Sequence, residues 1–154
     1  MSAAVGWIEL GNWREAEEEL KKIAPAWRTH TNVLEIRWVL CGKAGDWERC
    51  VEIGHELVKA EAESSFGWVH RSFALHELKR TQEAADLLIP ATILFPKEWL
   101  IRYNLACYSC QLGNHPEARK WLKAAMRLGD AKQVKLMASN DPDLEPLRAE
   151  IEGL

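Results

Sequence analysis

The sequence predicts an all-α fold, an α-solenoid of about four antiparallel helix pairs with C-terminal capping helices. The first observation that predicts it is a period of 34 residues, which relates Gly11, Gly45, Lys79 and Gly113. The second is a small residue five positions after each of these, at Ala16, Cys50, Ala84 and Ala118. Further apolar or small residues follow at steps of four and three, the spacing of a buried stripe on a helix. Such an array is typical of binding proteins.

Each repeat is expected to contain two helices joined by a turn at the glycine position. A residue without Cβ easily takes the left-handed conformation that ends a helix there. Asn12, Asp46 and Asn114 are expected to cap the helix that follows. We expect first helices at 2–10, 31–43, 65–78 and 97–112. We expect second helices at 13–24, 47–61, 81–94 and 115–128.

The third repeat departs from this pattern in two places. Lys79 and Arg80 stand at the turn and cap positions, so we expect the helix cap at Thr81. Pro90 lies inside the second helix, where it removes the backbone hydrogen bond to Asp86 O and clashes with that turn. A kink is therefore expected at Pro90.

The repeat stops after Gly129, which divides the chain into a repeat array at 1–129 and capping helices at 130–154. Asp130 is placed to cap a short helix that ends near Ala138, and Asp141 with Pro142 to start a last one. This last helix carries three apolar residues on one side, Leu144, Leu147 and Ile151. Because a solenoid exposes an apolar face at its end, the tail is suited to covering that face.

The composition indicates a folded protein with nearly balanced charge. Hydrophobic residues make up 47% of its 154 residues, and the net charge is −3. This balance argues against nonspecific nucleic-acid binding, and the basic stretch 119–135 is interpreted as a solvated helix face. No apolar run approaches the roughly 18 residues of a membrane span, and the N-terminus lacks the pattern of a secretory signal. We expect a cytoplasmic protein with no membrane or nucleic-acid partner.

The period and the small and apolar positions resemble those of the tetratricopeptide repeat (TPR) family. The fourth repeat matches best, with Asn104-Leu105-Ala106 in its first helix, Gly113-Asn114-His115 at the turn, and Ala118 with Leu122 in its second helix. The second repeat departs, because Arg37 and Trp38 stand where the family prefers a leucine and a small residue. The tail resembles the ending of many bacterial proteins of this family. The resemblance implies a right-handed superhelix whose concave face is lined by the first helix of each pair.

The resemblance further implies that a partner binds in a groove on this concave face. Spacings of three and four residues independently place each set of candidates on one face of its helix. The composition is apolar and aromatic with a few polar groups, as in peptide-recognition grooves. An alternative is that some of these side chains pack between neighbouring helices. The predicted groove residues are Asn32, Glu35, Val39, Phe66, Val69, His70, Phe73, His76, Leu100, Tyr103, Asn104, Cys107 and Cys110.

The chemistry of this face indicates what kind of protein or peptide it would bind. One branch of the family binds a partner's C-terminal carboxylate with Lys, Arg and Asn residues. Here only Asn104 falls at a comparable place, while Glu35, Val69 and Cys107 occupy others. We therefore expect no carboxylate clamp, and instead a partner that presents apolar side chains and a basic residue for Glu35.

Cys107 and Cys110 have the CxxC spacing, and His76 is placed to point toward them. A structural zinc site normally needs four ligands, and a redox pair usually lies at a helix N-terminus, so we interpret both as reduced, structural thiols. His70 is interpreted as a hydrogen-bonding residue, since no nucleophile has an evident partner base and orienting acid. We expect no enzymatic activity, no cofactor and no metal.

Two other functions are left open by the sequence. The length and the repeat number resemble those of small acidic secretion chaperones, although their additional N-terminal dimerisation helix is not evident here. A self-associating scaffold is the other alternative, because Trp7 and Trp13 lie in a first repeat with only about nine residues ahead of Gly11. That alternative predicts a homodimer formed through the N-terminal repeat.

Overall fold

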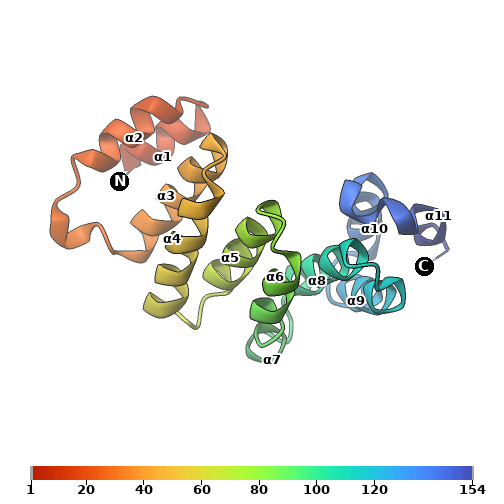
Figure 1. Cartoon of the computed structure of the whole chain (residues 1–154). Helices are drawn as coiled ribbons and strands as arrows, with labels where there is room; N and C mark the ends of the chain where they lie inside the picture. Colours follow the sequence, from red (N-terminus) through yellow and green to blue (C-terminus); the bar gives the residue numbers. More distant parts are fainter. Residues whose placement is uncertain (1, 154) are drawn as a thin grey trace. The chain divides into compact units, whose positions relative to one another are not determined.

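The computed structural model of the protein describes residues 2–153, and within that range the regular elements are all helical (Figure 1). Contacts between Cα atoms divide the chain into two compact units, Met1–Ala74 (unit 1) and Leu75–Leu154 (unit 2). Among residues 2–153, no helix combines the length and the apolar composition needed to cross a bilayer.

Unit 1 consists of two complete helix pairs and the greater part of a fifth helix. The bounds are α1 (Ser2–Glu9), α2 (Trp13–Lys21), the 3₁₀ turn η1 (Pro25–Trp27), α3 (Thr31–Ala44), α4 (Trp47–Ala60) and α5 (Ser65–Glu77). The last turn of α5, from Leu75 onward, belongs to unit 2. The helix pairs α1–α2 and α3–α4 each form a contacting hairpin, as the 34-residue period predicts.

The core of unit 1 contains the recurring small positions and one large exception. Ala16 and Cys50 are fully buried, which confirms the pattern of the sequence. Trp38, at a position where a small residue is expected, is nevertheless 7% exposed. Gly54 brings α4 close to α5, because a Cβ at that position would lie 2.8 Å from Cα of Arg71. The core of unit 1 thus buries the large indole of Trp38, while α4 and α5 are in close contact at Gly54.

Unit 2 contains the remaining helices and the C-terminal tail. The bounds are α6 (Thr81–Leu88), α7 (Ala91–Leu94), α8 (Trp99–Gln111), α9 (His115–Leu128), α10 (Ala131–Asn140), the 3₁₀ segment η2 (Pro142–Leu147) and α11 (Arg148–Ile151). The predicted kink at Pro90 is confirmed as a break, since α6 ends at Leu88 and α7 begins at Ala91.

The four turn positions adopt the same left-handed conformation. The φ angles are 71° at Gly11, 72° at Gly45 and 78° at Gly113, and Lys79 has a φ of 63°. At Lys79 the backbone N–H donates to His76 O at 2.8 Å, as the N–H of Gly113 donates to Cys110 O. The turn geometry therefore holds even where the residue carries a Cβ.

The predicted caps are confirmed in three repeats and wrong in the third. The side chains of Asn12, Asp46 and Asn114 each accept a hydrogen bond from the backbone N–H three residues later. In the third repeat the cap residue is Arg80, without a side-chain capping bond, and Thr81 is the first residue of α6. The turn geometry fixes the cap one position after the left-handed residue, whichever side chain stands there.

The tail packs onto unit 2 through the apolar side predicted for it. Leu144, Leu147 and Ile151 are fully buried, which confirms their common orientation. Asp130 caps α10 by accepting a hydrogen bond from the backbone N–H of Gln133 at 2.9 Å. The segment after α10 begins as a 3₁₀ helix and contacts α8.

Candidate partner-binding faces

In unit 2, the tail covers most of the predicted groove residues. Tyr103, Cys107 and Cys110 are at most 4% exposed. The Tyr103 hydroxyl donates a hydrogen bond of 2.8 Å to Oδ2 of Asp141, and Cys107 Sγ lies 3.6 Å from the same oxygen. One turn further along α8, Gln111 Nε2 donates to the backbone oxygen of Asp143 at 2.9 Å. The face of α8 is therefore occupied by a segment of the same chain.

His76, in the last turn of α5, holds the same segment. It is 4% exposed, and its Nε2–H donates to Oδ2 of Asp143 at 2.9 Å. Its Nδ1 shares a hydrogen bond of 3.0 Å with the Thr81 hydroxyl. Both ring nitrogens are thus used within unit 2, and neither hydrogen-bonds the cysteine pair.

The protonation of the donors fits their hydrogen bonds. Burial, followed by the nearby Asp141 carboxylate, raises the pKa of the Cys107 thiol, and burial likewise raises the pKa of Tyr103. Both groups therefore keep their protons at neutral pH and can donate to Asp141. The second oxygen of Asp141 accepts the backbone N–H of Asp143 at 3.0 Å and thereby caps η2.

Three potential metal ligands meet at this place. The ligand atoms of Cys107, Asp141 and Asp143 all lie within 4.8 Å of one another. Each already takes part in a hydrogen bond within the protein. Cys110 is not part of the group, and burial raises the pKa of its thiol, whereas a reactive CxxC pair has a lowered pKa. The CxxC spacing therefore does not build a common site.

The other predicted groove residues are more accessible, with one exception. In unit 2, Leu100 and Asn104 are half-buried. In unit 1, Val69 is buried, so its side chain packs in the interior of the unit and is not accessible to a partner. The remaining six residues are exposed or half-buried, and we call them the unit 1 face: Asn32, Glu35, Val39, Phe66, His70 and Phe73.

The unit 1 face includes part of an aromatic cluster, which consists of Trp38, Trp47, Phe66, His70 and Phe73. The His70 ring stacks on the Phe66 ring with a centroid distance of 3.6 Å and an interplanar angle of 13°. Trp38 lies edge-on to His70 at 4.5 Å. Phe73 is 38% exposed and meets the rings of Trp38 and Trp47 at 6.3 and 5.7 Å. Trp38 and Trp47 are not among the predicted groove residues, although a tryptophan at a small-residue position such as Trp38 is a usable signal.

Two titratable groups of this face are shifted by burial. Burial lowers the pKa of His70, whose Nδ1–H donates to Phe66 O at 2.9 Å, so the ring is a neutral aromatic group at neutral pH. Burial, followed by the charge of Glu61, raises the pKa of Glu35. Glu35 forms no ion pair or hydrogen bond with any residue of the range 2–153. It therefore offers an acid without a cation partner, three residues before Trp38 on α3.

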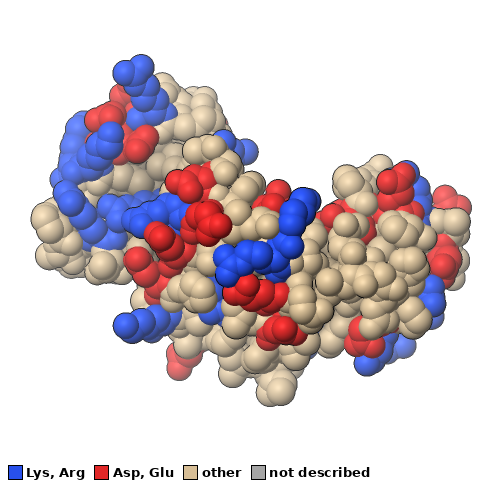
Figure 2. Space-filling model, in the orientation of Figure 1, with Lys and Arg blue, Asp and Glu red and all other residues tan. Residues whose placement is uncertain are grey.

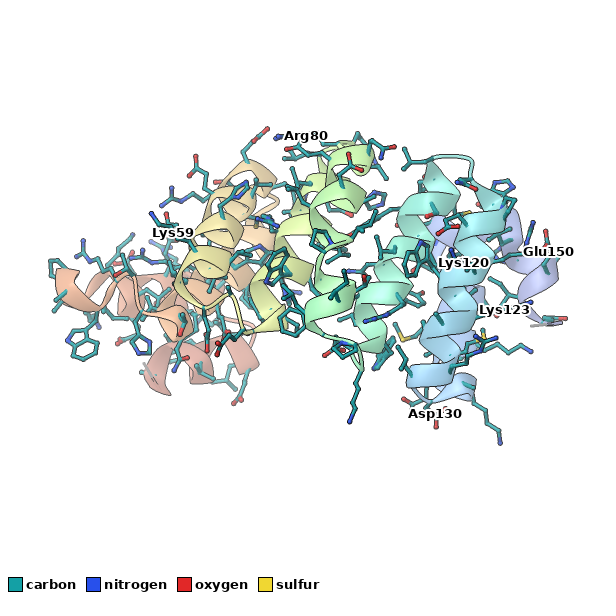
Figure 3. The ribbon with its side chains drawn as sticks, turned by 90° about the horizontal axis from the view of Figure 1, so that it is seen from below. Lys59, Arg80, Lys120, Lys123, Asp130 and Glu150 are labelled. Atoms are coloured by element: carbon teal, nitrogen blue, oxygen red, sulfur yellow. The ribbon has the colours of Figure 1, made fainter. Side chains whose placement is uncertain are left out.

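Basic and acidic side chains lie close together on the surface of the protein. In Figure 2, Lys and Arg lie next to Asp and Glu over α2 to α4. In the basic stretch 119–135, Lys120 and Lys123 project outward from α9 (Figure 3). Arg119 pairs with Glu150 at 2.9 Å and Lys120 with Glu117 at 3.3 Å. These pairs support the interpretation as a solvated helix face.

Comparisons with known proteins identify the fold. No family model matches the sequence, and no curated protein sequence matches it either. Solved structures of MamA are similar to it. MamA residues 41 to the end from Desulfovibrio magneticus RS-1 match at a TM-score of 0.73 and 14% identity, over 81% of this chain and 71% of that one. MamA MSR-1 C2 matches at a TM-score of 0.70 and 20% identity, over 84% and 74%. The fold is an all-α, TPR-like helical repeat.

Proposed function

We propose that the protein is an interaction module that binds a segment of another protein on the unit 1 face. The observation that carries the proposal is the partly exposed Phe73, which rests on the edge-on rings of Trp38 and Trp47. Rigid aromatic side chains that stay accessible are the usual anchors of protein interfaces. A ring already held by other rings loses little conformational entropy when a partner binds.

The partner would present an apolar side chain to Phe73 and a Lys or Arg to Glu35. The Glu35 carboxylate has lost part of its hydration and has no cation beside it among the described residues. A basic group from a partner would stabilise its charged form. An acidic segment would meet repulsion at the same place.

Unit 2 supports the proposal by analogy within the same chain. There, side chains at predicted groove positions of α8 hold a short 3₁₀ segment through Tyr103 and Cys107. A first-helix face of this protein can therefore hold an irregular segment. We propose that the partner uses unit 1, where the predicted groove residues of the unit 1 face are exposed or half-buried.

A homodimer through the N-terminal repeat stays a second prediction. Trp7 and Trp13 are both half-buried within unit 1, and the Lys43 ammonium lies 5.1 Å from the centroid of the Trp13 ring. Leu10 of the same repeat is 76% exposed, so part of this apolar surface is accessible to a second copy. Light scattering over a dilution series tests it, and a monomer at every concentration would count against it.

The experiment that tests the interaction is quantitative capture on the immobilised protein. The variant Phe73→Ala should lose a set of captured proteins, whereas Ile93→Ala should retain it. Ile93 is 83% exposed in unit 2 and serves as a matched control for removing a surface hydrophobe. Tyr103 is unsuitable for this test, because its substitution would disturb the buried contact with the tail.

A further inference from the structure

Unit 1 contains a cavity of about 360 Å³ between α2, α3 and the start of α4. Its apolar lining includes Leu20 from α2, Leu40 from α3 and Ile53 from α4. None of these residues belongs to the unit 1 face. The cavity is large enough for a small organic group.

Arg37 of α3 lines the cavity, at a position where the fourth repeat has an apolar side chain. Two periods later in the sequence, the equivalent position holds Leu105, which is 1% exposed. Arg37 is half-buried and makes no hydrogen bond or ion pair with any residue of the range 2–153. A guanidinium has five N–H donors, so this one can accept an anion without giving up a partner.

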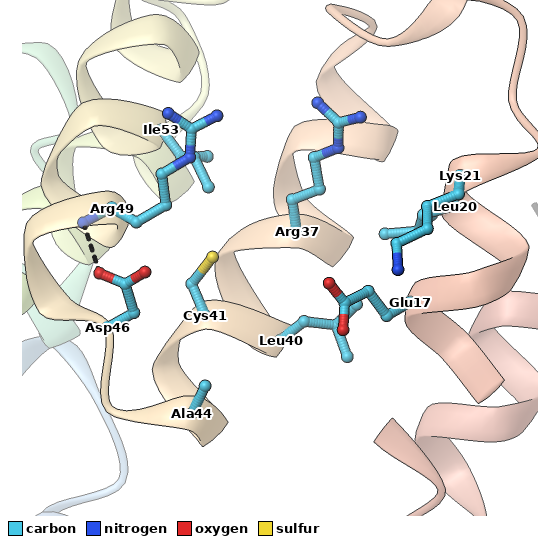
Figure 4. A pocket seen from close by; sticks show the side chains of 10 residues that line it. All are labelled: Glu17, Leu20, Lys21, Arg37, Leu40, Cys41, Ala44, Asp46, Arg49 and Ile53. Atoms are coloured by element: carbon cyan, nitrogen blue, oxygen red, sulfur yellow. Dashed lines mark hydrogen bonds between the residues drawn. The ribbon is translucent and has the colours of Figure 1, made fainter. Parts of the chain in front are cut away.

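Two other basic side chains that line the cavity already pair with acidic side chains. Arg49 donates to Glu52, and Lys21 pairs with Glu18 at 2.8 Å. Figure 4 shows the guanidinium groups of Arg37 and Arg49 at one end of the cavity and the carboxylates of Glu17 and Asp46 at the other. The Arg37 end therefore favours an anionic group, whereas at the opposite end the Lys21 ammonium lies beside the Glu17 carboxylate.

We propose that this cavity binds an apolar group that carries a carboxylate, with Arg37 binding the carboxylate and Leu20, Leu40 and Ile53 contacting the apolar part. Two sources share this chemistry, a small aliphatic or aromatic carboxylic acid and the apolar C-terminal residue of a peptide. A guanidinium without an ion-pair partner can form charge-assisted hydrogen bonds to both oxygens of a carboxylate, and apolar walls beside it would exclude water from them.

Cys41 provides the readout, because it lines the cavity and is the least buried of the four cysteines. A bound ligand should slow the alkylation of Cys41 by a maleimide, followed by mass spectrometry of the intact protein. Burial, followed by the charge of Asp46, raises the pKa of the Cys41 thiol, so the rate is measured at mildly alkaline pH.

The probes are phenylbutyrate and a short peptide that ends in leucine with a free carboxylate. Phenylbutanol and the amidated peptide are their uncharged counterparts. We expect the acids to protect Cys41 and to bind at least about tenfold more tightly than the uncharged probes, because one charge-assisted hydrogen bond is lost in the latter. The tighter of the two acids identifies the source of the natural ligand.

Arg37→Met retains the length of the side chain and removes its charge. It should reduce acid binding to the level of the uncharged probes, whereas Arg37→Lys should retain part of it. Arg14→Met, on the exposed surface of α2 outside the cavity, is the control and should change nothing. Equal protection by acids and uncharged probes, unchanged binding in Arg37→Met, or no protection by either acid would overturn the proposal.

Discussion

Tyr103 and Asp141 lie 38 residues apart in the sequence, and their side chains are joined by a hydrogen bond of 2.8 Å. The bond ties the tail of unit 2 to the middle of α8. Because the same carboxylate also meets Cys107 and caps η2, one side chain organises the start of the tail. The predicted groove of unit 2 is closed by this contact, which leaves the unit 1 face as the candidate for binding a partner.

The contact between these two residues should appear as an energetic coupling. Asp141→Ala removes the acceptor for Tyr103 and for the backbone N–H of Asp143, and should lower the free energy of unfolding by roughly 1–3 kcal/mol. Tyr103→Phe should lower it by about 1 kcal/mol. Urea denaturation of the two single variants and the double variant measures the coupling. Because both changes break one bond, the double variant should lose less than the sum.

Glu145→Ala is the matched control for this cycle. Glu145 is exposed in the same 3₁₀ segment and pairs only loosely with Arg148, at 3.7 Å. Its substitution should change the stability by less than about 0.5 kcal/mol. Strictly additive effects of Asp141→Ala and Tyr103→Phe would mean that the bond does not hold the tail.

The four cysteines should differ in their reactivity. Cys41 is half-buried, and Cys50, Cys107 and Cys110 are buried. A maleimide should therefore label Cys41 first, and faster as the pH rises, because its pKa is raised and the thiolate is the reacting form. In Asp141→Ala, labelling of Cys107 should accelerate as the tail loosens. Labelling of Cys107 in the unchanged protein as fast as that of Cys41 would refute the closed face of α8.

Lys79 should be the position where a glycine stabilises the protein. Its φ of 63° costs a residue with a Cβ about 1–2 kcal/mol, part of which glycine loses again through the entropy of the unfolded chain. Lys79→Gly should therefore raise the free energy of unfolding by roughly 0.5–1 kcal/mol in urea denaturation. Lys123→Gly, inside α9, should instead lower it by about 1 kcal/mol. A loss of stability in Lys79→Gly would contradict the left-handed turn.

Glu35 should make the stability fall as the pH rises above its ordinary pKa. Its pKa is raised in the folded state from the usual 4.5, so the folded protein binds more protons than the unfolded chain between the two values. Stability from this group is therefore fully present below pH 4.5 and is lost as the pH rises through the folded pKa. Glu35→Gln should flatten that part of the profile in urea denaturation, and Glu63→Gln, at an exposed acid, is the control and should leave it unchanged.

The sequence predicted the helix pairs because the period fixes features that act locally. Left-handed turns, caps and small positions each depend on a few neighbouring residues, and even Lys79 follows the geometry of its glycine counterparts. The closed face of unit 2 could not be predicted in this way. Tyr103 lies in the fourth repeat and Asp141 in the tail after the repeats. No local sequence signal predicts that the two aspartates of the tail contact a tyrosine and a histidine. Trp38 is an intermediate case. The sequence shows that a tryptophan stands at a position where the repeat has a small residue, but it does not show which aromatic rings pack against that tryptophan.

The most direct test of the account is a photo-crosslinking amino acid placed at position 73. Incorporation at 73 should give covalent adducts with a partner, and an excess of the protein without the label should compete with them. The same amino acid at position 93, which is more exposed, is the control and should give none of these adducts. Adducts at 73 that disappear in Glu35→Lys would support a partner with a basic residue. Adducts that form equally at both positions, or at 93 alone, would contradict binding on the unit 1 face.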